Sequence, residues 1–527
     1  MIKGHNLIGL TESNEGKEFL QSFSPVTQSK LPEQFAVATS EEVNKAVDKA
    51  SAAFVVYKGK TAEERAVFLE TVAEEIMALG DELIQRAMLE TGLPEARLMG
   101  ERGRTTGQLK LFADVLREGS WVEAVIDTAL PERKPLPRSD LRKMLMPIGP
   151  IAVFGASNFP FAFSTAGGDT ASALAGGNTV IVKAHDSHLG TNELVATAIN
   201  NAVKKCNMPD GVFSTVIGEG PVTGIQLVKH EGIKAVGFTG SYNAGMAIFR
   251  AAVNDRKTPI PVFAEMSSIN PVLLLPEKLR QDENVAAQVS ASITLGAGQF
   301  CTNPGLLFLI EDEAADKFTK KLAEVIGASP AGIMLNPNIC RSYYKGREVI
   351  AKQKGVNILF EGEDACANYK ASAFLTRVSA ADFISNPDLQ NEVFGPSSLI
   401  VACKDKHELL QALQCLHGQL TATILANPNE LNDFADCIDM LSGKVGRVVY
   451  NGVPTGVEVS HAMVHGGPFP ATTNANSTSV GADAIKRFVR PLCLQDCPEQ
   501  FLPEALKNSN RLNIMRKING QYTKESL

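Results

Sequence analysis

Cys301 is the residue of this chain whose surroundings best suit covalent chemistry. It lies in the segment GAGQFCTNPG, after a helix-like run at 283–298 and before Pro304 and Gly305. Glycine and proline on both sides of the thiol indicate a tight turn between two elements, and catalytic residues are commonly carried on such turns. Most cysteines are small, inert core residues, but a thiol in such a turn can be exposed and activated as a nucleophile.

Two further side chains could assist a nucleophilic thiol. Glu265 ends the apolar run PVFAEM, where a carboxylate is rarely buried unpaired. It is either a surface strand end or a general base whose pKa an apolar setting raises. Asn158 follows a strand in FGASNFPF, and its amide could either hold a turn or donate to a developing oxyanion.

Two strand-to-helix turns could hold a phosphate group. Gly240 and Ser241 end a strand, and Gly245 follows at the start of the next helix, where backbone N–H groups can bind an anion. Gly218 and Gly220 form a second turn of this kind. The Gly-x-x-x-x-Gly spacing is a weak signal and differs from the usual dinucleotide fingerprint, so both turns could also be purely structural.

The elements that must position these residues form a doubly wound α/β pattern. Amphipathic periodicity predicts helices over 62–90 and 103–118, followed by a proline-rich connector at 131–137. Strand-like apolar runs begin near 144, 179, 213, 235 and 261, and a second series begins near 269, 305, 398, 421 and 446. Such runs between helices indicate parallel sheets buried on both faces. We therefore expect two successive α/β units joined near 266–270.

Composition and charge narrow the class of protein. The chain has 527 residues and a net charge of −7, which does not favour a nucleic-acid partner. The sequence shows no apolar stretch of the ~18–20 residues that a membrane span needs, and its N-terminus does not resemble a signal peptide. The nine cysteines indicate neither a zinc site nor a disulfide framework. We expect a cytoplasmic enzyme that acts on a small molecule, without a metal or a membrane partner.

In their order along the chain, these segments resemble the aldehyde dehydrogenase superfamily over nearly the whole sequence. The matching segments are FGASNFPFAFSTAGGDTASALAGGNTVIVKAH, AVGFTGS, FAEMSSINP, GQFCTNPG and NEVFGPSS. Within the superfamily, PTGVEVSHAMVHGGPFPATT and TSVGADAIKRFVRP are similar to 2-oxoglutarate-semialdehyde (2,5-dioxopentanoate) dehydrogenases, a subgroup close to NADP-dependent fatty-aldehyde dehydrogenases. The resemblance implies NAD(P)-dependent oxidation of an aldehyde to an acid, with 2,5-dioxopentanoate as the expected substrate and 2-oxoglutarate as the product.

The resemblance also implies a role for each matching residue. Cys301 attacks the aldehyde carbon, Asn158 and the Cys301 backbone N–H hold the oxyanion, and Glu265 activates the water that hydrolyses the thioester. The expected cofactor-binding residues are Lys183, Asp186, Gly218, Gly240, Ser241, Gly245, Glu392 and Phe394. Lys183 would bond the adenosine ribose and Glu392 the nicotinamide ribose. Gly240 and Ser241 would lie by the pyrophosphate and Phe394 beside the nicotinamide.

Three features bear on how closely the chain follows the family pattern. Ser267 and Ser268 stand where two glycines are common, and HGGPFPATT at 465–473 replaces a Phe-Gly-Gly segment of the substrate mouth. Asp186 lies three residues after Lys183 and favours NAD, because a carboxylate bonds ribose hydroxyls and repels a 2′-phosphate. The subgroup resemblance favours NADP, so the expected cofactor is NAD or NADP, with the local charges favouring NAD.

The expected substrate carries a carboxylate at the end away from its aldehyde. Arginine binds both oxygens of a carboxylate, and Arg104 lies on the predicted helix whose counterpart in the family lines the substrate tunnel. The alternative for Arg104 is a solvated helix face. Phe159 is the other residue that we expect at the substrate.

The expected architecture is two doubly wound α/β domains, one cofactor-binding and one catalytic, with a small β oligomerisation arm and a homodimer or homotetramer as the assembly. The expected boundaries are 1–134 and 148–266 for the two parts of the cofactor-binding domain, 135–147 for the first part of the arm, 267–461 for the catalytic domain, and 462–527 for a segment that returns to the cofactor domain and the arm.

Three alternative functions stay open at this point. The enzyme could oxidise fatty or other aliphatic aldehydes instead of the dicarbonyl acid. A catalytically silent structural or binding relative is disfavoured, because such a protein needs neither Cys301, Glu265 nor Asn158. A reductase that makes aldehydes from acyl-CoA is disfavoured because a thioester meant for exchange with CoA gains nothing from a hydrolytic base such as Glu265.

Overall fold

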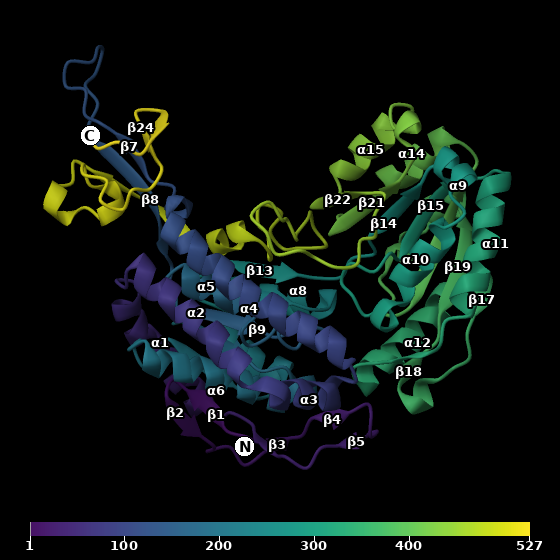
Figure 1. The fold of residues 1–527 in the computed structure, drawn as a ribbon, viewed down its shortest axis with the longest axis horizontal. Coiled ribbons are helices and arrows are strands. Elements are labelled where there is room, and N and C mark those ends of the chain that lie inside the picture. Colours follow the sequence, from purple (N-terminus) through teal and green to yellow (C-terminus); the bar gives the residue numbers. More distant parts are fainter. Residues whose placement is uncertain (1) are drawn as a thin grey trace.

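The computed structural model of this protein describes residues 2–527, and its first sheet occupies the centre of the molecule (Figure 1). The seven strands have the order β13-β12-β9-β10-β11-β1-β2, and those from β9 to β13 are parallel. Their bounds are β1 Asn6–Ile8, β2 Thr11–Ser13, β9 Ile151–Phe154, β10 Val180–Lys183, β11 Phe213–Val216, β12 Ala235–Thr239 and β13 Val262–Glu265. The chain leaves β9 for β10 on one side and returns to β12 on the other, which creates a switch point at the carboxyl edge, where ligands bind in such sheets.

Helices cover both faces of this sheet because its central strands carry apolar side chains on both sides. Alternate residues of β9 belong to different cores: Ile151 and Val153 pack with α2 to α6, whereas Ala152 and Phe154 pack with α1, α7 and α8. The helices are α1 Ser40–Tyr57, α2 Ala62–Ala78, α3 Gly80–Thr91, α4 Glu95–Glu118, α5 Gly168–Ala175, α6 Leu189–Lys205, α7 Ile225–Lys229 and α8 Tyr242–Asn254.

Two of the predicted helices have different bounds in the structure. The predicted helix at 62–90 is two helices, α2 and α3, because Gly80 takes a left-handed φ of 56° at the junction and glycine adopts that conformation without steric cost. The predicted helix at 103–118 is the second half of α4, which begins at Glu95. The longer helix matters for the site, because its first half carries Arg97 and Glu101.

The second seven-stranded sheet lies at one end of the molecule, on the right of Figure 1, and has the order β17-β19-β20-β15-β14-β21-β22. Its bounds are β14 Pro271–Leu274, β15 Leu306–Ile310, β17 Asn357–Glu361, β19 Phe374–Ser379, β20 Ser397–Cys403, β21 Thr421–Leu425 and β22 Arg447–Tyr450. Only β17 is antiparallel to its neighbour. The helices are α9 Pro276–Gln281, α10 Val285–Thr294, α11 Glu313–Gly327, α12 Pro337–Ala351, α13 Ala380–Ser385, α14 Lys406–Gln414 and α15 Ala435–Ser442. The predicted α/β class with two parallel sheets is confirmed.

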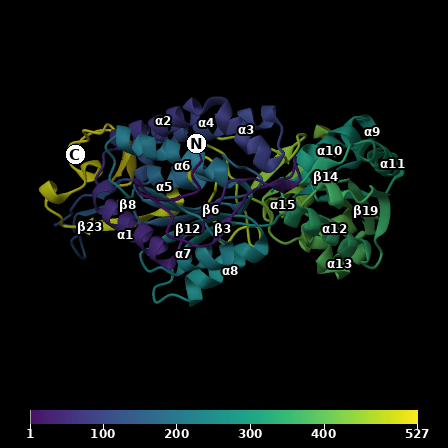
Figure 2. The same cartoon turned by 90° about the horizontal axis from the view of Figure 1, so that it is seen from below.

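A third, smaller sheet projects from the opposite end of the molecule in both views (Figures 1 and 2). Its order is β23-β8-β7-β24-β25, with β7 Val125–Asp127, β8 Leu141–Pro147, β23 Val489–Gln495, β24 Arg516–Ile518 and β25 Gln521–Thr523. The segment between β22 and β23 passes over the first sheet to reach it (Figure 1). The domain boundaries and the role of this arm stay predictions. Among residues 2–527, no helix combines the length and the apolar character that crossing a membrane requires.

Candidate active site

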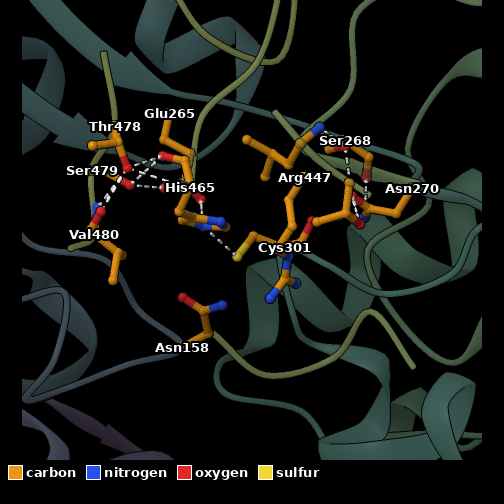
Figure 3. A network of polar contacts seen from close by, with 12 residues as sticks. Asn158, Glu265, Ser268, Asn270, Cys301, Arg447, His465, Thr478, Ser479 and Val480 are labelled. Atoms are coloured by element: carbon orange, nitrogen blue, oxygen red, sulfur yellow. Dashed lines mark hydrogen bonds and ion pairs between the residues drawn. The ribbon is translucent and has the colours of Figure 1, made fainter. Parts of the chain in front are cut away.

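The Cys301 loop is held rigidly where it leaves α10. Residues 295–298 form a short 3-10 turn in which Ala297 and Gly298 have φ of 56° and 66°. A Cβ on Gly298 would lie 2.3 Å from the backbone of Gly395, so this position requires glycine. The Asn270 side-chain amide donates to the carbonyl of Cys301 at 2.8 Å, and the loop is therefore anchored at the nucleophile itself (Figure 3).

Glu265 and His465 lie against the thiol of Cys301. The Sγ of Cys301 is 3.5 Å from the Nε2 of His465, and that nitrogen is 2.9 Å from the Oε1 of Glu265. The Ser479 hydroxyl donates to the other carboxylate oxygen at 2.8 Å. Glu265 and His465 are almost completely buried, so a thiol, an imidazole and a carboxylate share one enclosed chamber (Figure 3).

The electrostatics of this group differ from those expected from the sequence. Burial raises the pKa of Glu265, but the opposing interactions with His465, Ser479 and Cys301 hold it below its ordinary value. The expected raised pKa is therefore wrong, and Glu265 is ionised near neutral pH. Burial, followed by the nearby Glu265 carboxylate, raises the pKa of the Cys301 thiol well above its ordinary value. The half-buried thiol thus holds its proton, and the activation that the turn suggested is not present in this structure.

These two shifts define what the chamber can do chemically. A protonated thiol must lose its proton as it attacks, and the ionised Glu265 carboxylate, to which the Nε2 of His465 donates, is the acceptor next to it. An ionised carboxylate beside the sulfur can later take a proton from an attacking water. The geometry therefore supports formation of a bond to sulfur and its subsequent hydrolysis.

Helix α4 positions Asn158 beside the Cys301 loop. The Oε1 of Glu101 accepts from the backbone N–H groups of Phe161 and Ala162 at 2.9 and 3.0 Å, and Arg97 donates to the carbonyl of Asn158 at 3.1 Å. The buried Asn158 amide donates to the carbonyl of Gln299 at 3.1 Å and faces the Cys301 chamber (Figure 3). One of its two N–H groups thus stays available for an oxyanion.

An aromatic cluster lies next to this loop and includes Phe159. Its ring is 5.3 Å from that of Phe163 and 5.6 Å from that of Phe300, both edge-on. The ring of Phe163 is 6.1 Å from the imidazole of His465. Phe159 is thus part of an apolar wall that continues to the thiol chamber, which is the setting that an aldehyde carbon chain requires.

Arg104 lies over this wall and is half-buried. Its guanidinium is 5.0 Å from the ring centre of Phe163, and its Nε donates to the carbonyl of Val457 at 3.2 Å. Both terminal nitrogens are buried and have no hydrogen-bond partner within residues 2–527. Burial lowers the pKa of Arg104, while the charges of Glu101, Cys301 and Glu265 act in the opposite direction. The alternative of a solvated helix face is therefore wrong.

The first group of expected cofactor residues gathers at the carboxyl edge of the first sheet. Lys183 ends β10, Gly240 follows β12, and Ser241 caps α8 by accepting from the N–H of Ala244. The Lys183 ammonium lies 2.5 Å from the Oδ1 of Asp186. A cation, a carboxylate and the exposed N-terminus of a helix are together the donors and acceptors that a dinucleotide needs.

Two of the expected glycines are explained by packing alone. A Cβ on Gly218 would lie 2.0 Å from the Thr223 hydroxyl, and one on Gly245 would lie 2.7 Å from the side chain of Met266. A Cβ on Gly220, in contrast, would meet nothing within 4 Å, which leaves the open space that an approaching cofactor needs. The structure thus points to Gly220 more than to Gly218 as the open part of this turn.

Glu392 and Phe394 lie on the loop before β20 and line a pocket together with Ser268 and Phe300. Burial raises the pKa of Glu392 to about 7, against hydrogen bonds from the Ser267 side chain and the Ser268 backbone. The two serines that replace the usual glycines therefore contact the carboxylate expected to bind a ribose.

His465 and Arg447 lie beside Cys301 (Figure 3), but neither residue was predicted from the sequence. Arg447 starts β22 and donates to the carbonyls of Pro454 and Gly456; the charge of Cys301 acts on its guanidinium. His465 lies 164 residues from Cys301 and 200 from Glu265 along the chain. The only available signal was the unusual HGGPFPATT segment, which placed a histidine at the substrate mouth without showing which side chains it contacts.

Comparison with known proteins identifies the family to which this fold and this thiol site belong. The family model described as aldehyde dehydrogenase family matches residues 10–488, so the chain belongs to the aldehyde dehydrogenase family, whose members are NAD(P)-dependent oxidoreductases. The chain is 50% identical over 522 residues to alpha-ketoglutaric semialdehyde dehydrogenase 2 of Azospirillum brasilense, covering 99% of each chain. It is 48% identical to alpha-ketoglutaric semialdehyde dehydrogenase of Acinetobacter baylyi, covering 93% of each.

Solved structures show the same fold at lower sequence identity. A mutant of betaine aldehyde dehydrogenase from Staphylococcus aureus, in complex with NAD+, matches with a TM-score of 0.79 and 18% identity over 94% of this chain and 98% of that one. 1-Pyrroline-5-carboxylate dehydrogenase from Thermus, with bound NAD, matches with a TM-score of 0.77 and 21% identity over 93% and 92%.

Proposed function

We propose that this enzyme oxidises 2,5-dioxopentanoate to 2-oxoglutarate. The observation that carries the proposal is the pair of unpartnered, buried guanidinium nitrogens of Arg104, beside an apolar wall that leads to Cys301. A buried charge without a partner is costly, and the distal carboxylate of this substrate would supply the partner. The two relatives at 50% and 48% identity, both named for alpha-ketoglutaric semialdehyde, support the same substrate.

In the proposed reaction, the sulfur of Cys301 attacks the aldehyde carbon while its proton passes to the Glu265 carboxylate, which releases that proton to solvent before the hydrolysis step. The free N–H of Asn158 and the backbone N–H of Cys301 stabilise the oxyanion. After oxidation, the acyl group is a thioester of Cys301. Glu265 takes a proton from water, the water oxygen bonds the acyl carbon, and the carbon–sulfur bond breaks to release the acid.

The residues present fit NAD(P), whose nicotinamide accepts the hydride when the cofactor is bound. Lys183 and Asp186 would hold the adenosine ribose, Gly240 and Ser241 the diphosphate, and Glu392 the second ribose, with Phe394 beside the nicotinamide. We propose NAD as the preferred form, because Asp186 bonds ribose hydroxyls and repels a 2′-phosphate. Its ion pair with Lys183 weakens that repulsion without removing the acceptor.

A comparison of kcat/KM between 2,5-dioxopentanoate and aliphatic aldehydes of six to twelve carbons, with each cofactor, tests the substrate. We expect the dicarbonyl acid to be preferred because loss of one charge-assisted contact costs about 1.5–3 kcal/mol. Equal or higher values for the aliphatic aldehydes would replace this proposal by a fatty-aldehyde dehydrogenase.

The Arg104→Met variant tests the residue itself. It should raise KM for 2,5-dioxopentanoate and spare or improve hexanal, because only the first substrate carries a carboxylate. Arg104→Lys should lose less, since it keeps the charge but not the bidentate geometry. Arg102→Met is the matched control, because Arg102 is on the same helix but donates to the carbonyl of Gly80. Equal losses for both substrates in Arg104→Met would remove Arg104 from the carboxylate site.

We also propose that the five-stranded arm joins copies of this chain into a homodimer or homotetramer. The three most exposed large apolar side chains of the described residues lie on one of its strands or on the segments that connect its strands, namely Tyr522, Phe501 and Leu136. Such exposure on a projecting sheet is typical of an interface. Light scattering during size-exclusion chromatography should give a dimer or tetramer mass, and a monomer mass would contradict the proposal. A cytoplasmic location stays a prediction from the sequence.

A further inference from the structure

Three donor atoms of different chemistry converge on one point of the thiol chamber. The Sγ of Cys301, the Nε2 of His465 and a carboxylate oxygen of Glu265 all lie within 4.8 Å of one another. Thiolate, imidazole and carboxylate are the ligands of Zn²⁺. We propose that these side chains form a site for a thiophilic divalent cation, Zn²⁺ above all, whose binding reversibly blocks the nucleophile.

The spacing of the donor atoms fits a tetrahedral cation. With a Zn–S bond of about 2.3 Å and Zn–N and Zn–O bonds of about 2.0 Å, the sulfur and nitrogen lie about 3.5 Å apart and the nitrogen and oxygen about 3.3 Å apart. The Cys301–His465 distance is 3.5 Å and the His465–Glu265 distance is 2.9 Å. The second must widen by a few tenths of an ångström, and the sulfur and the carboxylate oxygen lie within 4.8 Å of each other. Three ligands leave the fourth position open for water.

The surroundings prepare the ligands for this role. The Ser479 hydroxyl donates to the Oε2 of Glu265, which fixes the carboxylate and leaves Oε1 for the cation. The Nδ1 of His465 is buried and has no hydrogen-bond partner within the described chain. When the cation displaces the proton that Nε2 donates to Glu265, Nδ1 can carry the imidazole proton and Nε2 presents its lone pair. A thiolate and a carboxylate together balance the two charges of the cation.

The charges around the site favour reversible binding over a permanent structural ion. Arg104 and Arg447 both interact electrostatically with Cys301, and their positive charge opposes a cation. Hard cations such as Mg²⁺ prefer all-oxygen sites, so the sulfur and imidazole select thiophilic ions. A bound cation would occupy both the sulfur lone pair that attacks the aldehyde and the carboxylate expected to activate water. Its removal by a chelator frees both groups.

The test uses the reduced, full-length enzyme after treatment with a chelator. Co²⁺ serves as the spectroscopic probe, and we expect one Co²⁺ per chain with a thiolate-to-metal absorption band that Zn²⁺ abolishes. Zn²⁺ should slow the alkylation of Cys301 by iodoacetamide, followed by mass spectrometry, by about tenfold or more, and EDTA should restore it. These readouts do not depend on which aldehyde the enzyme oxidises.

Substitution of each proposed ligand tests whether Co²⁺ binds at Cys301, His465 and Glu265. Cys301→Ser should lose the absorption band, and His465→Gln and Glu265→Gln should each weaken Co²⁺ binding by at least about tenfold, the scale of perturbed metal sites. The matched control is Cys366→Ser, because Cys366 is also a half-buried free thiol but interacts with Cys340 instead of His465; it should bind Co²⁺ like the wild type. Full binding by both His465→Gln and Glu265→Gln, with unchanged thermal midpoints, would overturn the proposal, as would a band lost only in Cys366→Ser.

Discussion

Two carboxylates whose charges act on Cys301, Glu265 and Glu392, have pKa values shifted in opposite directions. Glu265 meets an imidazole, a hydroxyl and a thiol, and these interactions hold its pKa below the ordinary value despite burial. Glu392 receives hydrogen bonds only from Ser267 and Ser268, and burial raises its pKa to about 7. The charge of Glu265 raises the pKa of Glu392 further, so the two groups are electrostatically coupled.

The difference shows that the balance between burial and polar partners decides the charge of each carboxylate, because burial outweighs the two serine hydrogen bonds at Glu392 and is outweighed at Glu265. On the thiol side, three polar partners keep Glu265 ionised and ready to take a proton. Glu392 changes its charge close to neutral pH, so a ligand that binds beside it can shift its protonation. The pair therefore suits two separate tasks, proton transfer by Glu265 and ligand binding by Glu392.

The largest expected effect comes from replacing the ionised carboxylate. Glu265→Gln should give a burst of NAD(P)H equal to the site concentration, followed by turnover reduced by up to about 10⁴-fold, because the thioester loses its general base. Rapid-mixing absorbance measures both phases. Cys301→Ala, which lacks the nucleophile, is the control and should show no burst. Loss of the burst in Glu265→Gln would instead assign this carboxylate to activation of the thiol.

The next largest effect is expected from a neutral substitution beside Cys301, which removes the side-chain amide of Asn158. Asn158→Ala should lower kcat by about 10²–10³-fold, the typical contribution of one oxyanion donor. Its present partner, the carbonyl of Gln299, is a backbone group, so the loop should keep its position. Cofactor affinity, measured by fluorescence titration, should change little. A loss of cofactor affinity as large as the loss of kcat would show that Asn158 acts through the fold of the loop.

The strands of the parallel sheets could be predicted because they are buried on both faces and appear as continuous apolar runs. The runs at 179 and 421 correspond to β10 and β21. Short or edge strands escaped prediction, and so did β19, whose apolar run is interrupted by Thr376 and Arg377. The edge hairpin of β1 and β2 has only three residues in each strand, and β17 is largely exposed. The tight junction at Gly80 also escaped, because both helices share one periodicity.

Candidate site residues could be predicted where the neighbouring residues in the sequence marked a turn or a strand end. The glycines before Cys301 and the strand before Glu265 marked both positions. The contact of His465 with these two residues could not be predicted, since it joins segments more than 160 residues apart. The predicted direction of the Glu265 pKa shift was wrong for the same reason, because the sequence does not reveal that His465 lies beside Glu265 and lowers its pKa. Local spacing predicts a turn, whereas charge depends on neighbours that only the folded chain brings together.

The pH dependence of the free energy of unfolding tests the raised pKa of Glu392. A folded-state pKa of about 7, against an ordinary value of 4.5, means that the folded chain keeps a proton that the unfolded chain releases between these pH values. The free energy of unfolding should therefore fall as pH rises from about 4.5 to 7. Glu392→Gln should remove that contribution, on the order of 1–2 kcal/mol after allowance for partial exposure.

Denaturant titrations of wild type and Glu392→Gln at pH 5, 6 and 7 measure this difference. The Glu265→Gln background sharpens the comparison, because removing that charge should lower the pKa of Glu392 and move the loss of stability to lower pH. A difference between wild type and Glu392→Gln that does not vary with pH would show that Glu392 is not held protonated by its surroundings.

The smallest expected effect is at the ion pair of Asp186 and Lys183. Asp186→Ser should raise the ratio of kcat/KM with NADP to that with NAD, because it removes repulsion of a 2′-phosphate. The change should be about tenfold or less, since Lys183 already neutralises part of the charge and Asp186 is half exposed. Asp255→Ser is the matched control: Asp255 is equally exposed and paired with Lys229 at the far end of α8, and its loss should leave the ratio unchanged. If the wild type already prefers NADP tenfold or more, the carboxylate of Asp186 does not select the cofactor, and the ion pair instead presents Lys183 to the phosphate.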